Sequence, residues 1–155
     1  PLLDSAGRLI GINTAIYSPS GASAGIGFAV PVDMVAKVVP QLIAQGRYVH
    51  PALGIQIDAG LNERMVRAFG TPGVYVLKVS PGSAAAAAGL QGAQITRDGR
   101  VVPGDIITAI DGKPVDGVSR YLSRLDDFKV GDNVTLTIMR DERQIDLQAT
   151  LQPDA

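Results

Sequence analysis

The feature that most constrains this chain is a change of pattern close to residue 50, which divides its 155 residues into two unequal parts. Residues 1–46 contain apolar, strand-like stretches followed by one stretch with helical spacing. Residues 53–152 alternate short apolar stretches with Gly, Pro and Asp turns, a pattern typical of a small α+β domain. Residues 47–52 are expected to be a linker. Because the chain opens as a strand, a turn and a second strand with no lead-in, the first part is interpreted as the end of another fold.

The composition excludes several classes of function. Apolar residues make up 46% of the chain and aromatic residues only 5%, which predicts an aliphatic core. A net charge of −1 with mixed signs gives no basic surface for nucleic acid or an anionic membrane. The absence of Cys excludes disulfides, thiolate metal sites and a Cys nucleophile. No apolar run approaches the roughly 20 residues that span a bilayer, and no metal or cofactor is expected.

In the first part, the pattern predicts two strands and a helix. Residues 8–17 and 26–31 are apolar and rich in β-formers, whereas the small residues 18–25 are expected to form a loop. Residues 32–45 carry apolar side chains at helical spacing, with Gly46 as the stop. Pro40 is expected to kink this helix or to start a second one.

In the second part, the pattern predicts a series of short strands and helices. Strands are expected in "LGIQIDA", "GVYVLKVSP", "GDIITAIDGKPV", "VTLTIMR" and "QIDLQATL". Helices are expected in "NERMVRAFG", with Asn62 as N-cap and Gly70 as stop, in "GSAAAAAGL", capped by Ser83, and over residues 118–128.

Three connections have their own signals. Asp111-Gly112 predicts a hairpin turn, and a second turn is expected over residues 141–143. The insert over residues 91–103 is expected to be an irregular loop or a hairpin. It is either an idle loop or a second contact surface, and the sequence leaves both readings open.

Four stretches of the second part occur in a distinctive order: "ALGIQI", "VSPGSAAAAAGL", "GDIITAIDGKPV" and, after a helix, "VGDNVTLTIMRDE". This order resembles a PDZ domain of the circularly permuted bacterial kind. The resemblance implies a small, partly open β-barrel with two or three helices. It also implies binding of the C-termini or extended segments of other proteins.

The residues at the expected groove suit that chemistry. A loop ending in Gly can turn backbone N–H groups toward one point and hold a carboxylate, while the next strand offers a free edge to a peptide. The resemblance places Leu53, Gly54 and Ile55 at this loop. Ile57 shares a strand face with Ile55. Leu122 and Leu125 lie three residues apart on one helix face and complete an apolar pocket for a C-terminal side chain.

The alternative is that these apolar residues are simply core. For any apolar residue, burial in the core is the more common role. The resemblance leaves the groove and core interpretations evenly balanced for Leu53, Ile55 and Leu122. For Leu125, a position in the core fits the pattern as well. Ile107 and Ile110, in "GDIITAIDG", are expected to fill the core together with Ile106.

The opening "PLLDSAGRLIGINTAI", together with "SGASAGIGFAVPVDMV", is similar to the last portion of a chymotrypsin-type barrel in the HtrA/Deg family of serine proteases. The resemblance implies an incomplete, all-β trypsin-like barrel remnant and a connecting helix before the PDZ domain. In that family the Ser nucleophile lies in a Gly-Asn-Ser-Gly-Gly segment directly before "PLLD". The chain is therefore expected to be the C-terminal part of such a protease.

A Ser-His-Asp triad cannot be assigned within this chain. The single histidine, His50, lies in the "YVHP" linker and is expected to be an exposed linker residue. The Ser residues of "SPSGAS" have no partner base. The chain alone is expected to be inactive, whereas the longer protein is expected to hydrolyse peptides.

The family resemblance implies that part of the protease specificity pocket remains. Thr14 would lie beside the triad Asp, and Ala15 and Ile16 would flank the primary pocket, with Gly25 and Ile26 in another wall. No acidic residue is placed at its base, so the pocket is expected to accept Val, Ala or Ile and to reject Lys and Arg. Residues 18–24 match a regulatory loop of the family, or form an ordinary surface loop.

Three functions are compatible with these patterns. The first is an HtrA-like serine endopeptidase whose PDZ domain recruits unfolded proteins or regulates their proteolysis, with a trimer-based assembly in the periplasm or another extracytoplasmic compartment implied by the resemblance. The second is a stand-alone PDZ adaptor without catalysis. A PDZ-bearing metalloprotease is the third, against which the absence of a His-Glu-x-x-His motif counts. In the first case residues 2–30 cannot close a barrel, so they are expected to be disordered, to pair with another copy or to pack on the PDZ domain.

Overall fold

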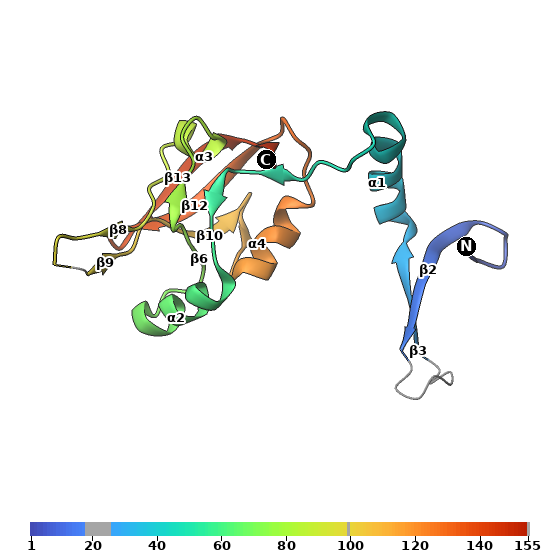
Figure 1. Cartoon of the computed structure of the whole chain (residues 1–155), viewed down its shortest axis with the longest axis horizontal. Helices are drawn as coiled ribbons and strands as arrows, with labels where there is room; N and C mark the ends of the chain where they lie inside the picture. The colour runs from blue at the N-terminus through green and yellow to red at the C-terminus, as the bar shows by residue number, and fades with distance from the viewer. Residues whose placement is uncertain (18–25, 99, 155) are drawn as a thin grey trace. The chain divides into compact units, whose positions relative to one another are not determined.

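The computed structural model describes residues 1–17, 26–98 and 100–154, and it divides the chain into two compact units. The first unit is Pro1–Tyr48 and the second is Val49–Ala155 (Figure 1). The division therefore falls within the residues predicted to be a linker. Each unit has its own secondary structure and is described separately.

The first unit is a small antiparallel sheet followed by a helix. Strands β1 (Leu2–Leu3), β2 (Leu9–Tyr17) and β3 (Ile26–Pro31) pair in the order β1-β2-β3. Helix α1 (Val32–Gln45) follows directly and ends at Gly46, whose φ of 70° allows the left-handed cap. The helix continues through Pro40, so no second helix begins there.

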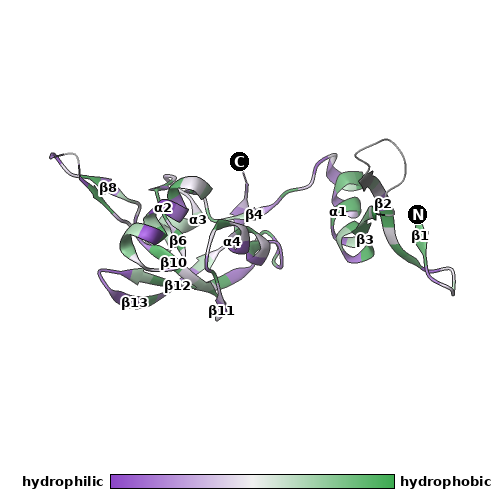
Figure 2. Ribbon diagram, turned by 90° about the horizontal axis from the view of Figure 1, so that it is seen from below, coloured by the Kyte–Doolittle hydropathy of each residue, from purple (hydrophilic) through white to green (hydrophobic). Residues whose placement is uncertain are grey.

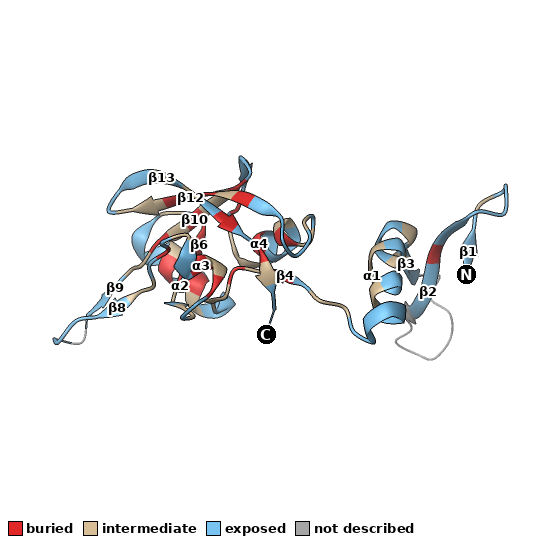
Figure 3. Ribbon diagram, turned by 90° about the horizontal axis from the view of Figure 1, so that it is seen from above, coloured by how far each residue is buried: buried red, intermediate tan, exposed pale blue. Residues whose placement is uncertain are grey.

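Much of the apolar surface of this sheet is exposed. Ile10 on β2 is 44% exposed and Phe28 on β3 is 56% exposed. Strand β3 is coloured largely as exposed (Figure 3). In the described residues the sheet is open, with β1 and β3 as its edges. Residues 1–17 and 26–48 have the secondary structure described above. The expected disorder, pairing with another copy and packing on the other unit stay predictions.

The second unit has the mixed, partly open architecture that the sequence predicted. Its helices in the described residues are α2 (Ala59–Phe69), α3 (Ala84–Ala87) and α4 (Val118–Leu125). Its strands are β4 (Pro51–Ala52), β5 (Ile55–Gln56), β6 (Val74–Tyr75), β7 (Lys78–Val79), β8 (Gln94–Ile95), β9 (Val101–Val102), β10 (Ile106–Ile110), β11 (Lys113–Pro114), β12 (Asn133–Arg140), β13 (Arg143–Thr150) and β14 (Gln152–Pro153).

The largest sheet runs in the order β11-β10-β12-β13. Strand β6 pairs with the first residues of β10, and β11 pairs with its last residues. Three two-stranded pairs surround it, namely β4 with β14, β5 with β7 and β8 with β9. The aliphatic core lies against this sheet. Its fully buried members include Leu53, Val74, Val76, Ile107, Ile110, Val134, Leu136 and Ile138.

Several elements differ from the prediction. Helix α2 begins at Ala59, because Asp58 rather than Asn62 is its N-cap and accepts the Leu61 N–H. Asn62 is buried and serves another purpose: its side chain donates to the Gly73 carbonyl and accepts the Tyr75 N–H. The strands around β5 and over residues 73–81 are shorter than predicted and interrupted. Helix α4 ends at Leu125, three residues before the predicted end.

The predicted turns are present. Asp111 and Gly112 have φ angles of 46° and 72°, as a two-residue hairpin turn requires. The β12–β13 turn consists of Asp141 and Glu142, with Arg143 already in the strand. The insert forms the β8–β9 hairpin, whose paired residues are largely hydrophobic (Figure 2).

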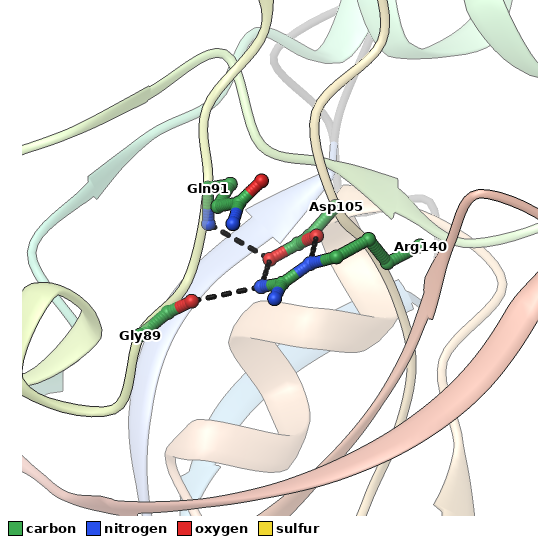
Figure 4. A network of polar contacts seen from close by, with 4 residues as sticks. All are labelled: Gly89, Gln91, Asp105 and Arg140. Atoms are coloured by element: carbon green, nitrogen blue, oxygen red, sulfur yellow. Dashed lines mark hydrogen bonds and ion pairs between the residues drawn. The ribbon is translucent and has the colours of Figure 1, made fainter.

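An ion pair between the partly buried Arg140 and the buried Asp105 joins the end of β12 to the residue before β10. Arg140 donates through Nε and Nη2 to the two carboxylate oxygens of Asp105, each at 2.7 Å, and through Nη2 to the Gly89 carbonyl (Figure 4). The Gln91 N–H also donates to Asp105, whose side chain is only 1% exposed. This bonding raises the pKa of Arg140 above its usual value, and it satisfies a carboxylate that would otherwise be costly to bury.

Replacing Arg140 with Met would leave the Asp105 carboxylate buried without its cation. We expect Arg140→Met to lower the free energy of unfolding by about 3 kcal/mol, measured by urea denaturation. Arg143→Met is the matched control, because the exposed Arg143 faces Arg140 across the same hairpin and should change stability by less than about 0.5 kcal/mol. Equal stability of the two variants would contradict the role given to the pair.

Candidate functional site

A hollow of about 770 Å³ lies in the second unit between the segment that contains β5 and helix α4. The six residues that the sequence placed at a peptide groove all line it: Leu53, Gly54, Ile55, Ile57, Leu122 and Leu125. Residues that the sequence analysis did not assign to the groove complete the lining, namely His50, Pro51, Ala52, Ser80, Pro81, Gly82, Ser83, Tyr121, Asp126, Gln152, Pro153 and Asp154.

The apolar lining is continuous with the core. Leu53 and Leu125 are only 1% and 4% exposed, so they are core residues that also contribute to the wall. Ile55 and Ile57 are partly buried and pack against the same core. Leu122, in contrast, is 51% exposed on α4. The hollow is therefore apolar at its base and open at its rim.

One edge of β5 faces away from its partner strand. The carbonyls of Gly54 and Gln56 accept hydrogen bonds from the N–H groups of Ser80, at 2.9 Å, and Leu77, at 3.1 Å. Successive residues of a strand point their backbone groups to opposite edges. The N–H and carbonyl of Ile55 therefore lie on the edge that does not face β7, where a further extended segment can pair.

The loop before β5 is held by a backbone bond from α3, since the Ala85 N–H donates to the Leu53 carbonyl at 2.8 Å. The neighbouring Ala84 N–H donates to the side chain of Gln152 on β14 at 2.6 Å. Gly54 itself has a φ of 75°. A Cβ at this position would lie 2.4 Å from the Ser83 Cβ, so only glycine fits.

Charged groups gather at one part of the rim. The Nδ1 of His50 lies 3.3 Å from Asp126 Oδ1, just beyond the end of α4. The His50 N–H donates to the carboxylate of Asp154 at 3.0 Å. His50 is thus exposed, as predicted for a linker residue, but it also lines the hollow. Burial raises the pKa of Tyr121, so this lining phenol stays neutral.

Sequence reasoning missed Tyr121, His50 and Asp126 as lining residues. The buried Tyr121 carried a usable signal, since it lies four residues before Leu125 and so shares its helix face. His50 and Asp126 carried none, because 76 positions separate them and only the fold brings them together.

The residues proposed for the protease pocket lie in the first unit. Thr14 and Ala15 line a second hollow of about 530 Å³, and Thr14 donates to the Phe28 carbonyl. Ile16 pairs with Gly27 and Tyr17 with Ile26 in the β2–β3 ladder. Ile26 is exposed, and the predicted wall residue Gly25 lies outside the described residues, as does the predicted loop over 18–24.

Within residues 1–17, 26–98 and 100–154, no cluster of three or more His, Cys, Asp or Glu side chains could hold a metal ion. Over the same ranges, no helix has the length and apolar character needed to cross a membrane.

Known proteins are similar to this chain over most of its length. The PDZ domain family matches residues 51–151. Protease Do-like 1, chloroplastic, from Arabidopsis thaliana is 46% identical over 99% of this chain and 34% of its own length. The periplasmic serine endoprotease DegP of Escherichia coli is 34% identical over 97% of this chain and 30% of its own length.

Solved structures give the same result. The HtrA-type protease AlgW with a decapeptide superposes with a TM-score of 0.66 at 30% identity, over 98% of this chain and 44% of that one. The serine endoprotease from Yersinia pestis superposes with a TM-score of 0.59 at 28% identity, over 99% of this chain and 46% of that one. The chain spans about a third of the length of the curated relatives it matches.

The close approach at Gly54 can be tested by adding one methyl group. We expect Gly54→Ala to lose at least about 1 kcal/mol more unfolding free energy than Gly70→Ala, measured by urea denaturation. Gly70 is the matched control, because its φ of 76° imposes the same backbone strain while nothing lies within 4 Å of its added Cβ. Equal losses would mean that the Ser83 contact imposes no constraint.

Proposed function

The chain belongs to the PDZ domain family, and its relatives along the whole length are HtrA-type serine proteases; on this premise we propose that its hollow binds the C-terminus or an extended segment of another protein. The observation that carries the proposal is the edge of β5 that faces away from β7, beside the apolar hollow. An extended peptide can add to such an edge as a further strand.

The lining residues suggest a position for the backbone, the terminal carboxylate and the terminal side chain of the peptide. Backbone groups of the peptide would pair with Ile55, and a terminal carboxylate would lie at the loop before Gly54. An apolar terminal side chain would enter the hollow against Ile57, Leu122 and Leu125. Main-chain bonds provide affinity in this mode of recognition, and the pocket provides specificity.

For the longer protein, we propose an HtrA-like serine endopeptidase in which the PDZ domain recruits or regulates substrates. The matches support this proposal over a stand-alone adaptor, because they extend through Pro1–Tyr48 as well as through the PDZ domain. A trimer-based assembly and a periplasmic or other extracytoplasmic location belong to the same proposal. Relatives named periplasmic or chloroplastic support the location.

The first unit would contribute part of the protease specificity pocket. Thr14 and Ala15 already line a hollow there, beside the ladder that contains Ile16 and Ile26. These neighbours are uncharged, so a Lys or Arg side chain would lose its hydration without gaining a counter-charge. We therefore assign the pocket to small or medium apolar side chains.

Peptide binding can be tested with a single exposed side chain. We expect Leu122→Asp to weaken binding of a Val-ending peptide at least about tenfold, measured by NMR titration of the ¹⁵N-labelled chain, because it puts a charge against the apolar hollow. The fold should survive, since Leu122 is 51% exposed. Ile95→Asp on the β8–β9 hairpin is the matched control and should bind normally. No binding by the unaltered chain would refute the groove.

The protease proposal predicts that peptide hydrolysis requires the longer protein. The chain alone should show no peptide hydrolysis, because a triad cannot be assigned within it. A longer protein that includes the preceding segment should cleave after Val, Ala or Ile and leave Lys and Arg sites intact, as measured by mass spectrometry of unfolded substrates. Preferred cleavage after Lys or Arg would contradict the apolar pocket.

A further inference from the structure

The phenol of Tyr121 is a buried polar group in the wall of the hollow. Tyr121 belongs to helix α4, lines the hollow and is only 3% exposed. Within the described residues, no hydrogen bond involves its phenol oxygen. Buried hydroxyl groups in folded proteins are ordinarily paired, so this one calls for a partner from outside the fold.

Tyr75 is a second buried tyrosine, and its phenol is paired in the ordinary way. Tyr75 is 1% exposed and does not belong to the lining of the hollow. Its hydroxyl donates to the Thr71 carbonyl at 3.1 Å. The two phenols are therefore buried to a similar degree, and they differ in whether the fold provides a hydrogen-bond partner.

The Tyr121 oxygen is open to a bound molecule. Among the described residues, the side-chain atom that is both fully enclosed and without a partner is Arg124 Nε. The unpartnered oxygen of Tyr121 is not enclosed in this way, and the open space that this residue borders is the hollow. A group that enters the hollow can therefore form a hydrogen bond with it.

The neighbours of Tyr121 in the lining are aliphatic. Leu122 follows it directly, and Leu125 lies four residues later on the same helix face. The proposed function places the terminal side chain of the peptide against these two leucines. A purely apolar side chain would displace water from the Tyr121 hydroxyl without replacing its hydrogen bond, which weakens binding.

We propose that Tyr121 is a specificity-determining residue of the groove, whose hydroxyl forms a hydrogen bond with the side-chain hydroxyl of a terminal threonine. The inference rests on the proposed peptide-binding function. Threonine suits both parts of the lining, because its methyl group contacts the leucines while its hydroxyl can donate to the phenol or accept from it. Valine has nearly the same shape without the hydroxyl, so a comparison of the two isolates the hydrogen bond.

The test uses two peptides that differ only in ending with Val or Thr, and measures their affinities by NMR titration of the full ¹⁵N-labelled chain. We expect Tyr121→Phe to bind the Val-ending peptide about threefold more tightly, and the Thr-ending peptide about threefold more weakly, than the unaltered chain. The preference for Thr relative to Val would thus fall about tenfold. Equal changes for both peptides would show that the phenol acts only through packing and would overturn the inference.

Tyr75→Phe is the matched control, because it removes a buried hydroxyl from a residue outside the lining. It should leave the relative affinity for the two peptides unchanged. Failure of both peptides to bind to the unaltered chain would instead refute the proposed function, and the inference with it.

Urea denaturation of the same two variants gives a measurement without peptide. Tyr75→Phe should lower the free energy of unfolding, since it removes the bond to the Thr71 carbonyl, whereas Tyr121→Phe should not lower it. Equal destabilisation by the two substitutions would reveal a bond of the Tyr121 hydroxyl within the fold and would overturn the inference.

Discussion

The hydrogen bond from the Ala85 N–H to the Leu53 carbonyl fixes the part of the second unit on which the groove depends. It joins the short helix α3 to the loop that leads into β5, while the Leu53 side chain is buried in the core. The loop is therefore anchored by a polar bond on one side and by apolar packing on the other. Because both anchors act on a residue next to Gly54, the following backbone keeps its orientation without a bound peptide.

The carboxylates in the core and at the rim are satisfied in different ways. Inside, the Asp105 carboxylate is matched by a two-bonded guanidinium and a backbone N–H, which removes the penalty of a buried charge. At the rim, the two carboxylates near His50 are exposed to water and need no permanent cation. The Asp105–Arg140 pair therefore favours one conformation, whereas the exposed charges at the rim contribute little to stability.

Local sequence signals predicted the elements whose causes are local. Asp111-Gly112 specified a hairpin turn, Gly70 a helix end and Ser83 an N-cap, and all three are present. The N-cap of α2 was misassigned, because Asn62 is as good a capping residue as Asp58 and only burial beside Tyr75 distinguishes them. The six groove residues were brought together as expected, since family resemblance and strand or helix periodicity both constrain them.

Pairs that are distant in sequence had no local signal. Arg140 and Asp105 are 35 positions apart, and His50 and Asp126 are 76 apart, so no periodicity links them. The exposure of Leu122 beside the buried Leu125 also depends on how α4 sits against the core, which spacing alone does not determine.

The two ends of the second unit meet at the groove, and this explains why its rim is charged. Strand β4 at the start pairs with β14 at the end, so Pro51 lies opposite Pro153 and His50 next to Asp154. Residues from the two ends of this unit form the rim, while the middle of the unit provides the apolar base. Closing a loop of this length costs chain entropy, which the β4–β14 bonds and the core behind Leu53 together offset. The groove is thus the place where the unit closes, and a peptide bound there would contact both ends at once.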